Sequence, residues 1–119
     1  MAEFAKVFEA LRSIMLPYAS ELDCVSDTKD RLYVNTRHLQ KNKKPLFFGA
    51  VQVNKNYVSY HLMPVYVNPR LLASISSNLK KHMQGKSCFN FTSVEPTLFK
   101  ELATLTEAGF KDYKVSGYV

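Results

Sequence analysis

Apolar residues at the start of the chain recur with the spacing of one face of a helix. They lie three or four positions apart, and charged residues stand between them. This spacing predicts an amphipathic N-terminal helix with an apolar stripe of Phe4, Val7, Phe8, Leu11, Ile14 and Met15. Pro17 has no backbone N–H and disfavours helical geometry at Leu16, so we expect the helix to end or kink there.

The middle of the chain is rich in β-forming residues. A short run at residues 32–34 (LYV) is followed by a basic, polar stretch and then by two longer runs, at 46–53 (LFFGAVQV) and 57–67 (YVSYHLMPVYV). An Asn-rich loop joins the two longer runs, which predicts an antiparallel hairpin. Gly49 and Pro64 interrupt the pattern. We interpret Gly49 as the site of a close backbone approach and Pro64 as the site of a bulge or strand edge.

A second helix is predicted after the hairpin. Asn68 is a favourable N-cap residue, and Pro69 already has the backbone φ of a first helical residue. Gly85 is a favourable C-cap residue. The apolar stripe between them contains Leu71, Leu72, Ile75, Leu79 and Met83. Residues 87–92 (SCFNFT) then alternate as a strand, with Phe89 and Phe91 on one face.

A third helix is predicted from Pro96 to Gly109, which we expect to stop it. Its buried stripe consists of Leu98, Leu102 and Leu105. The tail at 110–119 fits either an edge strand or packed coil. Helices before and after a run of hairpin-linked strands predict an α+β fold with an antiparallel sheet covered on one face.

Size and composition indicate one globular domain over residues 1–119, because 119 residues with 46% hydrophobic positions can bury a core without metal or disulfide help. Residues 1–16 lack the uninterrupted apolar run of a signal peptide or membrane span, so we expect a cytoplasmic protein that does not engage a membrane. Cys24 and Cys88 are expected to be buried thiols rather than a bridge or metal ligands.

The chain carries 16 Lys and Arg against 10 Asp and Glu, a formal net charge of +6. This charge favours anionic partners. The excess gathers in two stretches, which contain Arg37, Lys41, Lys43 and Lys44 and, further on, Lys80, Lys81, His82 and Lys86. Two interpretations stay open at this point, a phosphate-binding footprint for nucleic acid and a solvated surface.

The sequence contains no motif of a zinc protease, P-loop, nucleophile elbow or dinucleotide fold, and we expect neither catalysis nor a cofactor. His61 shares its strand face with Tyr57 and Ser59, a mixed surface that can line a ligand pocket. The alternative for His61 is a hydrogen-bonded histidine at the sheet surface. The candidate ligand-binding residues are His61, Tyr60, Tyr66 and Lys86.

Lys86 follows a predicted helix end and precedes a strand. We expect it to converge with Lys80 and Lys81 on an anion site, in a concavity shared with His61 or Tyr66. The alternative is that Lys86 stabilises the C-terminus of the second helix through the helix dipole.

The segments FGAVQVNKNYVSYHLMPVY, PRLL and GKSCFNF resemble the YdhG-like domain family, whose function is unknown. The similarity covers about residues 30–113, and GKSCFNF is its most specific part. The resemblance implies a single compact α+β domain with a curved antiparallel sheet. Some relatives are described as frataxin-like iron chaperones. That role relies on an acidic surface, and a net charge of +6 disfavours it here.

Three functions are therefore considered. The first is a small binding module for an anionic small molecule or a peptide, acting as a monomer or weak homodimer. The second is contact with nucleic acid through the basic stretches, which predicts affinity that depends strongly on salt. The third is an enzyme, for which no pair of nucleophile and base is visible.

Overall fold

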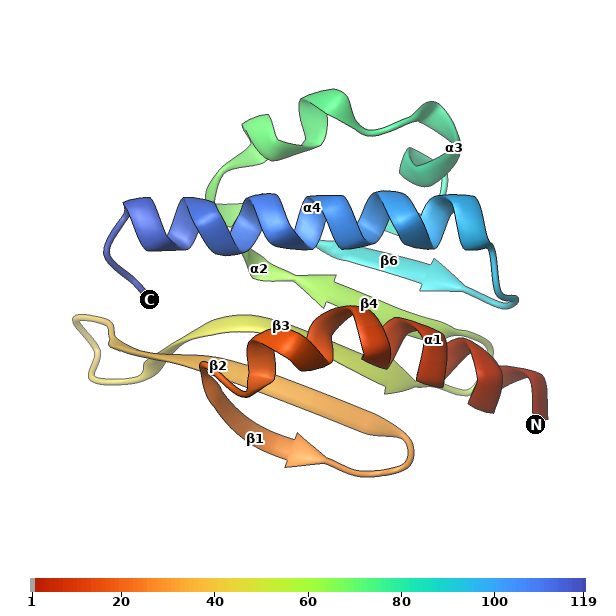
Figure 1. Ribbon diagram of the computed structural model, residues 1–119, viewed down its shortest axis with the longest axis horizontal. Coiled ribbons are helices and arrows are strands. Elements are labelled where there is room, and N and C mark those ends of the chain that lie inside the picture. Colours follow the sequence, from red (N-terminus) through yellow and green to blue (C-terminus); the bar gives the residue numbers. More distant parts are fainter. Residues whose placement is uncertain (1) are drawn as a thin grey trace.

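The computed structural model describes the backbone of residues 2–119 and the side chains of residues 4–119. Its centre is an antiparallel sheet of six strands in the order β1-β2-β3-β4-β6-β5. The strands are β1 (Asp23–Asp27), β2 (Arg31–Leu39), β3 (Pro45–Val53), β4 (Val58–Leu62), β5 (Met83–Gln84) and β6 (Cys88–Phe91). The helices are α1 (Ala2–Ala19), α2 (Met63–Val67), η1 (Pro69–Ser74), α3 (Ser77–Lys80) and α4 (Pro96–Val115). The predicted α+β class is confirmed (Figure 1).

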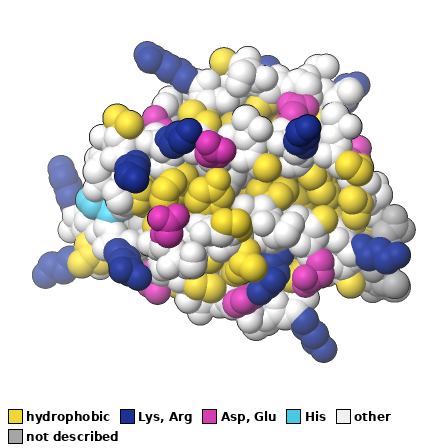
Figure 2. All heavy atoms as spheres, viewed as in Figure 1, with side chains coloured by type: hydrophobic (Ala, Val, Ile, Leu, Met, Phe, Trp, Pro, Cys, Tyr) yellow, Lys and Arg dark blue, Asp and Glu magenta, His cyan; other side chains and the backbone are white. Residues whose placement is uncertain are grey.

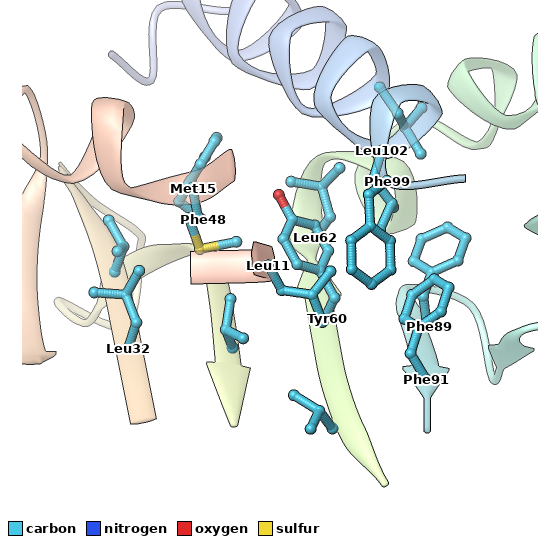
Figure 3. Close-up of a cluster of buried hydrophobic side chains, with 14 of the residues drawn as sticks. Leu11, Met15, Leu32, Phe48, Tyr60, Leu62, Phe89, Phe91, Phe99 and Leu102 are labelled. Carbon is cyan, nitrogen blue, oxygen red and sulfur yellow. The ribbon is translucent and has the colours of Figure 1, made fainter. Parts of the chain in front are cut away.

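The core lies between the sheet and the two long helices, α1 and α4 (Figure 3). One row across four neighbouring strands, Leu32, Val51, Tyr60 and Phe89, is fully buried. The stripes expected on the N-terminal and third helices cover this row, and Leu11 and Leu102 are fully buried within them. Figure 2 shows hydrophobic side chains in a band between α1 and α4 on this face, with charged side chains on both sides of the band.

Helix α1 continues past Pro17 to Ala19, so the predicted end at this proline is wrong. The proline removes one hydrogen bond of the helix, which the Ser13 carbonyl would accept, so other contacts must hold the last turn. Packing holds the turn in place. The Tyr18 ring lies 5.0 Å from Phe110 and 5.9 Å from Phe48, and Ala19 is buried.

Strand β2 is longer than the predicted run and extends into the basic stretch as far as Leu39. Strand β1 was not predicted, because its sequence DCVSD is polar and mostly exposed. It forms the sheet edge, and the Arg12 guanidinium binds the Asp27 carboxylate at 2.7 and 3.0 Å. Cys24 lies on this edge and is exposed, so its predicted burial is wrong. Four strand spacings separate it from Cys88 on β6, about 19 Å and too far for a disulfide bond.

The second strand of the predicted hairpin ends at Leu62, five residues before its expected end at Val67. Pro64 lies in the first turn of the short helix α2, where a missing N–H costs nothing. It is therefore neither a bulge nor a strand edge. The predicted close approach at Gly49 is confirmed, because a Cβ there would lie 2.8 Å from the backbone oxygen of His61.

The predicted second helix is broken into η1 and α3. The Asn68 cap is confirmed, since its side chain accepts a hydrogen bond from the Arg70 backbone N–H at 3.3 Å. Ser76 then acts as a second N-cap for Leu79, at 3.1 Å, and restarts the helix. Gly85 has φ of 79° in the turn between β5 and β6, so the predicted helix C-cap is wrong.

Helix α4 passes through Gly109, so the prediction that this glycine stops the helix is wrong. Gly109 is buried where α4 crosses α2, and a Cβ there would lie 2.8 Å from Cβ of Pro64. The chain is helical up to Val115, and the Tyr113 hydroxyl donates to the backbone oxygen of Phe47 at 2.9 Å. Within residues 2–119, no helix combines the length and the apolar character needed to cross a bilayer.

Candidate functional site

The long helices α1 and α4 lie on the same side of the sheet (Figure 1). Residues paired across antiparallel strands share a face, so the register shows which side chains point away from these helices. One such row joins Tyr33, Ala50, His61 and Cys88. A second row joins Arg31, Gln52, Ser59 and Asn90. We call the surface formed by these two rows and the neighbouring Phe47 the open face.

An aromatic ladder crosses the open face. The Arg31 guanidinium carbon lies 4.8 Å from the centre of the Tyr33 ring. The Tyr33 and Phe47 rings stack with centroids 4.8 Å apart and planes 27° apart. Phe47 in turn lies 6.4 Å from the His61 ring. Three strands thus present a cation and three rings side by side on one surface.

A polar hollow of about 290 Å³ adjoins this ladder. It is lined by Ala50, Gln52, Asn54, Tyr57, Ser59, His61, Gln84, Cys88 and Asn90. Its amides are partly paired with each other or with a hydroxyl: the Asn54 amide donates to Ser59 at 3.1 Å, and the Asn90 amide donates to Gln84 at 2.6 Å. His61 is its one ionisable nitrogen base, and no carboxylate or ammonium group lines it. The hollow therefore suits a neutral hydrogen-bonding group better than a bare anion.

His61 lies between the hollow and the ladder. It is half-buried, and desolvation lowers the pKa of its imidazole. The ring is consequently neutral near pH 7, with one nitrogen that donates a hydrogen bond and one that accepts. Burial likewise raises the pKa of the neighbouring Cys88 thiol, so this thiol is a poor nucleophile at neutral pH.

Tyr60 does not belong to this surface, although the sequence suggested it as a ligand-binding residue. It is fully buried on the helix side, and its hydroxyl pairs with Thr106 of α4 at 2.5 Å. The Thr106 hydroxyl donates to the Leu102 carbonyl at 2.7 Å, so Tyr60 is the donor in this pair. Consecutive strand residues point to opposite faces, and Tyr60 and His61 therefore cannot share one site.

Tyr66 and Lys86 lie next to each other, but neither lines the hollow beside His61. Tyr66 is 54% exposed on α2, and the Lys86 nitrogen lies 6.0 Å from the centre of its ring. Lys86 is exposed in the turn between β5 and β6, whereas Lys80 and Lys81 precede β5. The three lysines therefore do not converge, because β5 and part of the turn separate them. Helix α3, which precedes Lys86 in the chain, ends at Lys80 on the other side of β5, so the helix-dipole alternative for this second helix is also wrong.

The two basic stretches lie at opposite ends of the long axis of the molecule (Figure 1). Arg37, Lys41, Lys43 and Lys44 occupy the end of β2 and the turn to β3, and Lys80 and Lys81 the end of α3. They do not form one patch. Two further cations, Lys29 and Lys55, lie in the turns at the Arg31 end of the sheet.

Sequence reasoning missed Arg31, Tyr33, Phe47, Gln52 and Asn90 as members of one surface. Alternation along each strand places them on a face, but only the register between strands brings them together. Among the described side chains, those of residues 4–119, no three His, Cys, Asp or Glu groups gather where they could hold a metal ion. The iron-binding alternative thus gains no support from the geometry.

A scan of family models gives no match for this chain, and searches of curated proteins and of solved structures give no significant match. The resemblance to YdhG-like domains stays a prediction.

Proposed function

We propose that this domain is a binding module, without catalytic activity, whose open face binds nucleotides. The ladder of Arg31, Tyr33 and Phe47 is the observation that carries the proposal. Flat rings and a guanidinium plane on an uncovered sheet offer stacking partners for nucleobases. Each stacked base contributes about 1–3 kcal/mol in single-strand complexes.

The polar hollow supplies the complementary hydrogen bonds. The side chains of Gln52, Asn90 and neutral His61 provide both donors and acceptors, as the edge of a base requires. Because no group that lines the hollow is charged near pH 7, we expect a phosphate to bind outside it. Arg31 and the turn residues Lys29 and Lys55 lie at the adjacent end of the sheet and provide positive charge there.

The nucleotide can be a free small molecule or one unit of a single strand. Both carry the same chemistry, a planar base and a phosphate, and the net charge of +6 favours both. The distant basic stretches around Lys41 and Lys81 can be reached only by a longer chain. Strand binding would therefore be the more salt-dependent of the two.

The test is a fluorescence-anisotropy titration with a labelled single-stranded RNA of about eight nucleotides, competed with AMP. We expect Tyr33→Ala to weaken RNA binding by about 5- to 150-fold, which is the loss of one stacked base. The matched control is Tyr66→Ala, which removes an exposed tyrosine outside the sheet and should leave the affinity unchanged.

Displacement of the RNA by AMP would identify a free nucleotide as a ligand, and displacement only by a longer oligonucleotide would identify a strand. If neither RNA nor AMP binds, or if Tyr33→Ala weakens binding no more than Tyr66→Ala does, the open face is not a nucleotide site.

A further inference from the structure

We infer that a second binding site lies in the groove between η1 and α4, and that it receives an acidic amphipathic helix from a partner protein. The groove has a volume of about 540 Å³. It is lined by residues 70–75 on one side and by α4 between Thr97 and Ala108 on the other. It shares no residue with the open face, so this inference does not depend on the proposed function.

The groove exists because the chain from Asn68 to Ser76 is attached to α4 at its two ends. The Asn68 amide donates to Asp112 at 3.1 Å, and the Ser76 backbone N–H donates to Glu101 at 2.9 Å. The segment therefore runs antiparallel to α4, on the side away from α1 (Figure 1). Between the two attachments, η1 has no buried residue and leaves a furrow beside α4.

The floor of the furrow is apolar. Leu71 and Ile75 contribute from the η1 side and are only half-buried. Leu105 and Ala108 contribute from α4. Leu71, Ile75 and Ala108 remain partly accessible to water after the domain has folded, whereas Leu105 is buried. A partner that covers the three accessible side chains gains hydrophobic stabilisation.

The lining of the furrow carries two positive charges, Arg70 and Lys100, against one negative charge, Glu101, so its balance is positive. Glu101 is the one acidic residue in the lining, and Ser76 binds both of its oxygens, through its backbone N–H and its hydroxyl. Those hydrogen bonds lower the pKa of this carboxyl. Arg70 and Lys100 are exposed and lie at opposite ends. Arg70 faces the Ala108 end of α4, so about eight residues of helix, or about 12 Å, separate the two cations.

These dimensions fit a helix. The lining runs along α4 from Thr97 to Ala108, about 16 Å or three helical turns. A small ligand in so open a groove would leave one side in water, whereas small-molecule sites bury most of the ligand. An amphipathic helix needs to bury only one face. The face of the partner helix that fits this groove has two acidic residues seven positions apart. Its apolar residues lie three and four positions after the first of these acidic residues.

The probe is a synthetic helix of about 14 residues that carries this pattern, glutamate at its fourth and eleventh positions and leucine at its seventh and eighth, on an Ala/Gln background. Binding is measured by isothermal titration calorimetry with the full chain. We expect the double variant Arg70→Gln/Lys100→Gln to weaken binding about tenfold or more, since both charges would be lost. Both replaced side chains are exposed, so the double variant should fold as the original protein does.

Lys111→Gln is the matched control, because it removes an exposed lysine that pairs with Glu107 of α4, outside the groove. It should leave peptide binding unchanged, and the Arg70/Lys100 double variant should leave nucleotide binding at Tyr33 unchanged. No binding at about 1 mM peptide would overturn the inference. So would equal losses in the Lys111 control and the double variant, or equal binding of a peptide whose leucines are replaced by serine.

Discussion

Leu79→Ala and Leu102→Ala are each expected to lower the free energy of unfolding by about 2–5 kcal/mol. Both side chains are fully buried, Leu79 on α3 and Leu102 on α4. Truncation removes the transfer free energy of three carbon atoms and leaves a cavity that the surrounding helices and sheet fill only in part. Leu102 adjoins Phe99 and the sheet residues beneath α4 (Figure 3).

Urea unfolding measures both losses. The control is Val115→Ala, because this valine is 88% exposed at the end of α4 and should change the free energy by less than about 0.5 kcal/mol. If both leucine variants also changed the free energy of unfolding by less than about 0.5 kcal/mol, the assignment of the core between the helices and the sheet would be wrong.

Gly49→Ala is expected to cost about 1–3 kcal/mol, as overpacking of a close-packed interior does. An added Cβ would lie 2.8 Å from the backbone oxygen of His61 and would also overlap the methyl end of Met15. The methionine can move, but the oxygen belongs to the β3–β4 ladder and cannot move without distorting the strand that carries His61.

The Gly49→Ala loss is measured by thermal unfolding, alone and combined with Met15→Ala. The two changes should be less than additive, because truncating Met15 removes one of the two obstacles. Unchanged stability in the single variant would contradict the close approach between α1, β3 and β4.

The parts of the fold that depend on local periodicity could be predicted from the sequence. The β3–β4 hairpin follows from two β-forming runs around an Asn-rich loop, and the stripes of α1 and α4 follow from helical spacing. The errors arose where a distant contact decides the local structure. Helix α4 continues through Gly109, where Pro64 of α2 packs against it. The polar segment β1 is a strand because it pairs with β2 at the edge of the sheet.

The candidate site shows the same division. Alternation along β4 correctly placed His61 at a surface, and the same alternation should have removed Tyr60 from the site. The partnership of Arg31, Tyr33 and Phe47 depends on the register between β2 and β3, which shifts at an irregularity after Val34. No local pattern encodes such a shift, so the ladder became visible only in three dimensions.

The central claim is that the open face of the sheet binds nucleotides, and backbone amide chemical-shift mapping tests it most directly. On titration with the single-stranded RNA, we expect the largest shifts along β2, β3 and β4, at Tyr33, Phe47 and His61, and at Asn90 of β6. Amides of α1 and of the central turns of α4 should move little, because the sheet lies between them and the ligand. Shifts confined to residues 41–44 or 80–81, with none at Tyr33 and His61, would show binding by surface charge alone and would contradict the account.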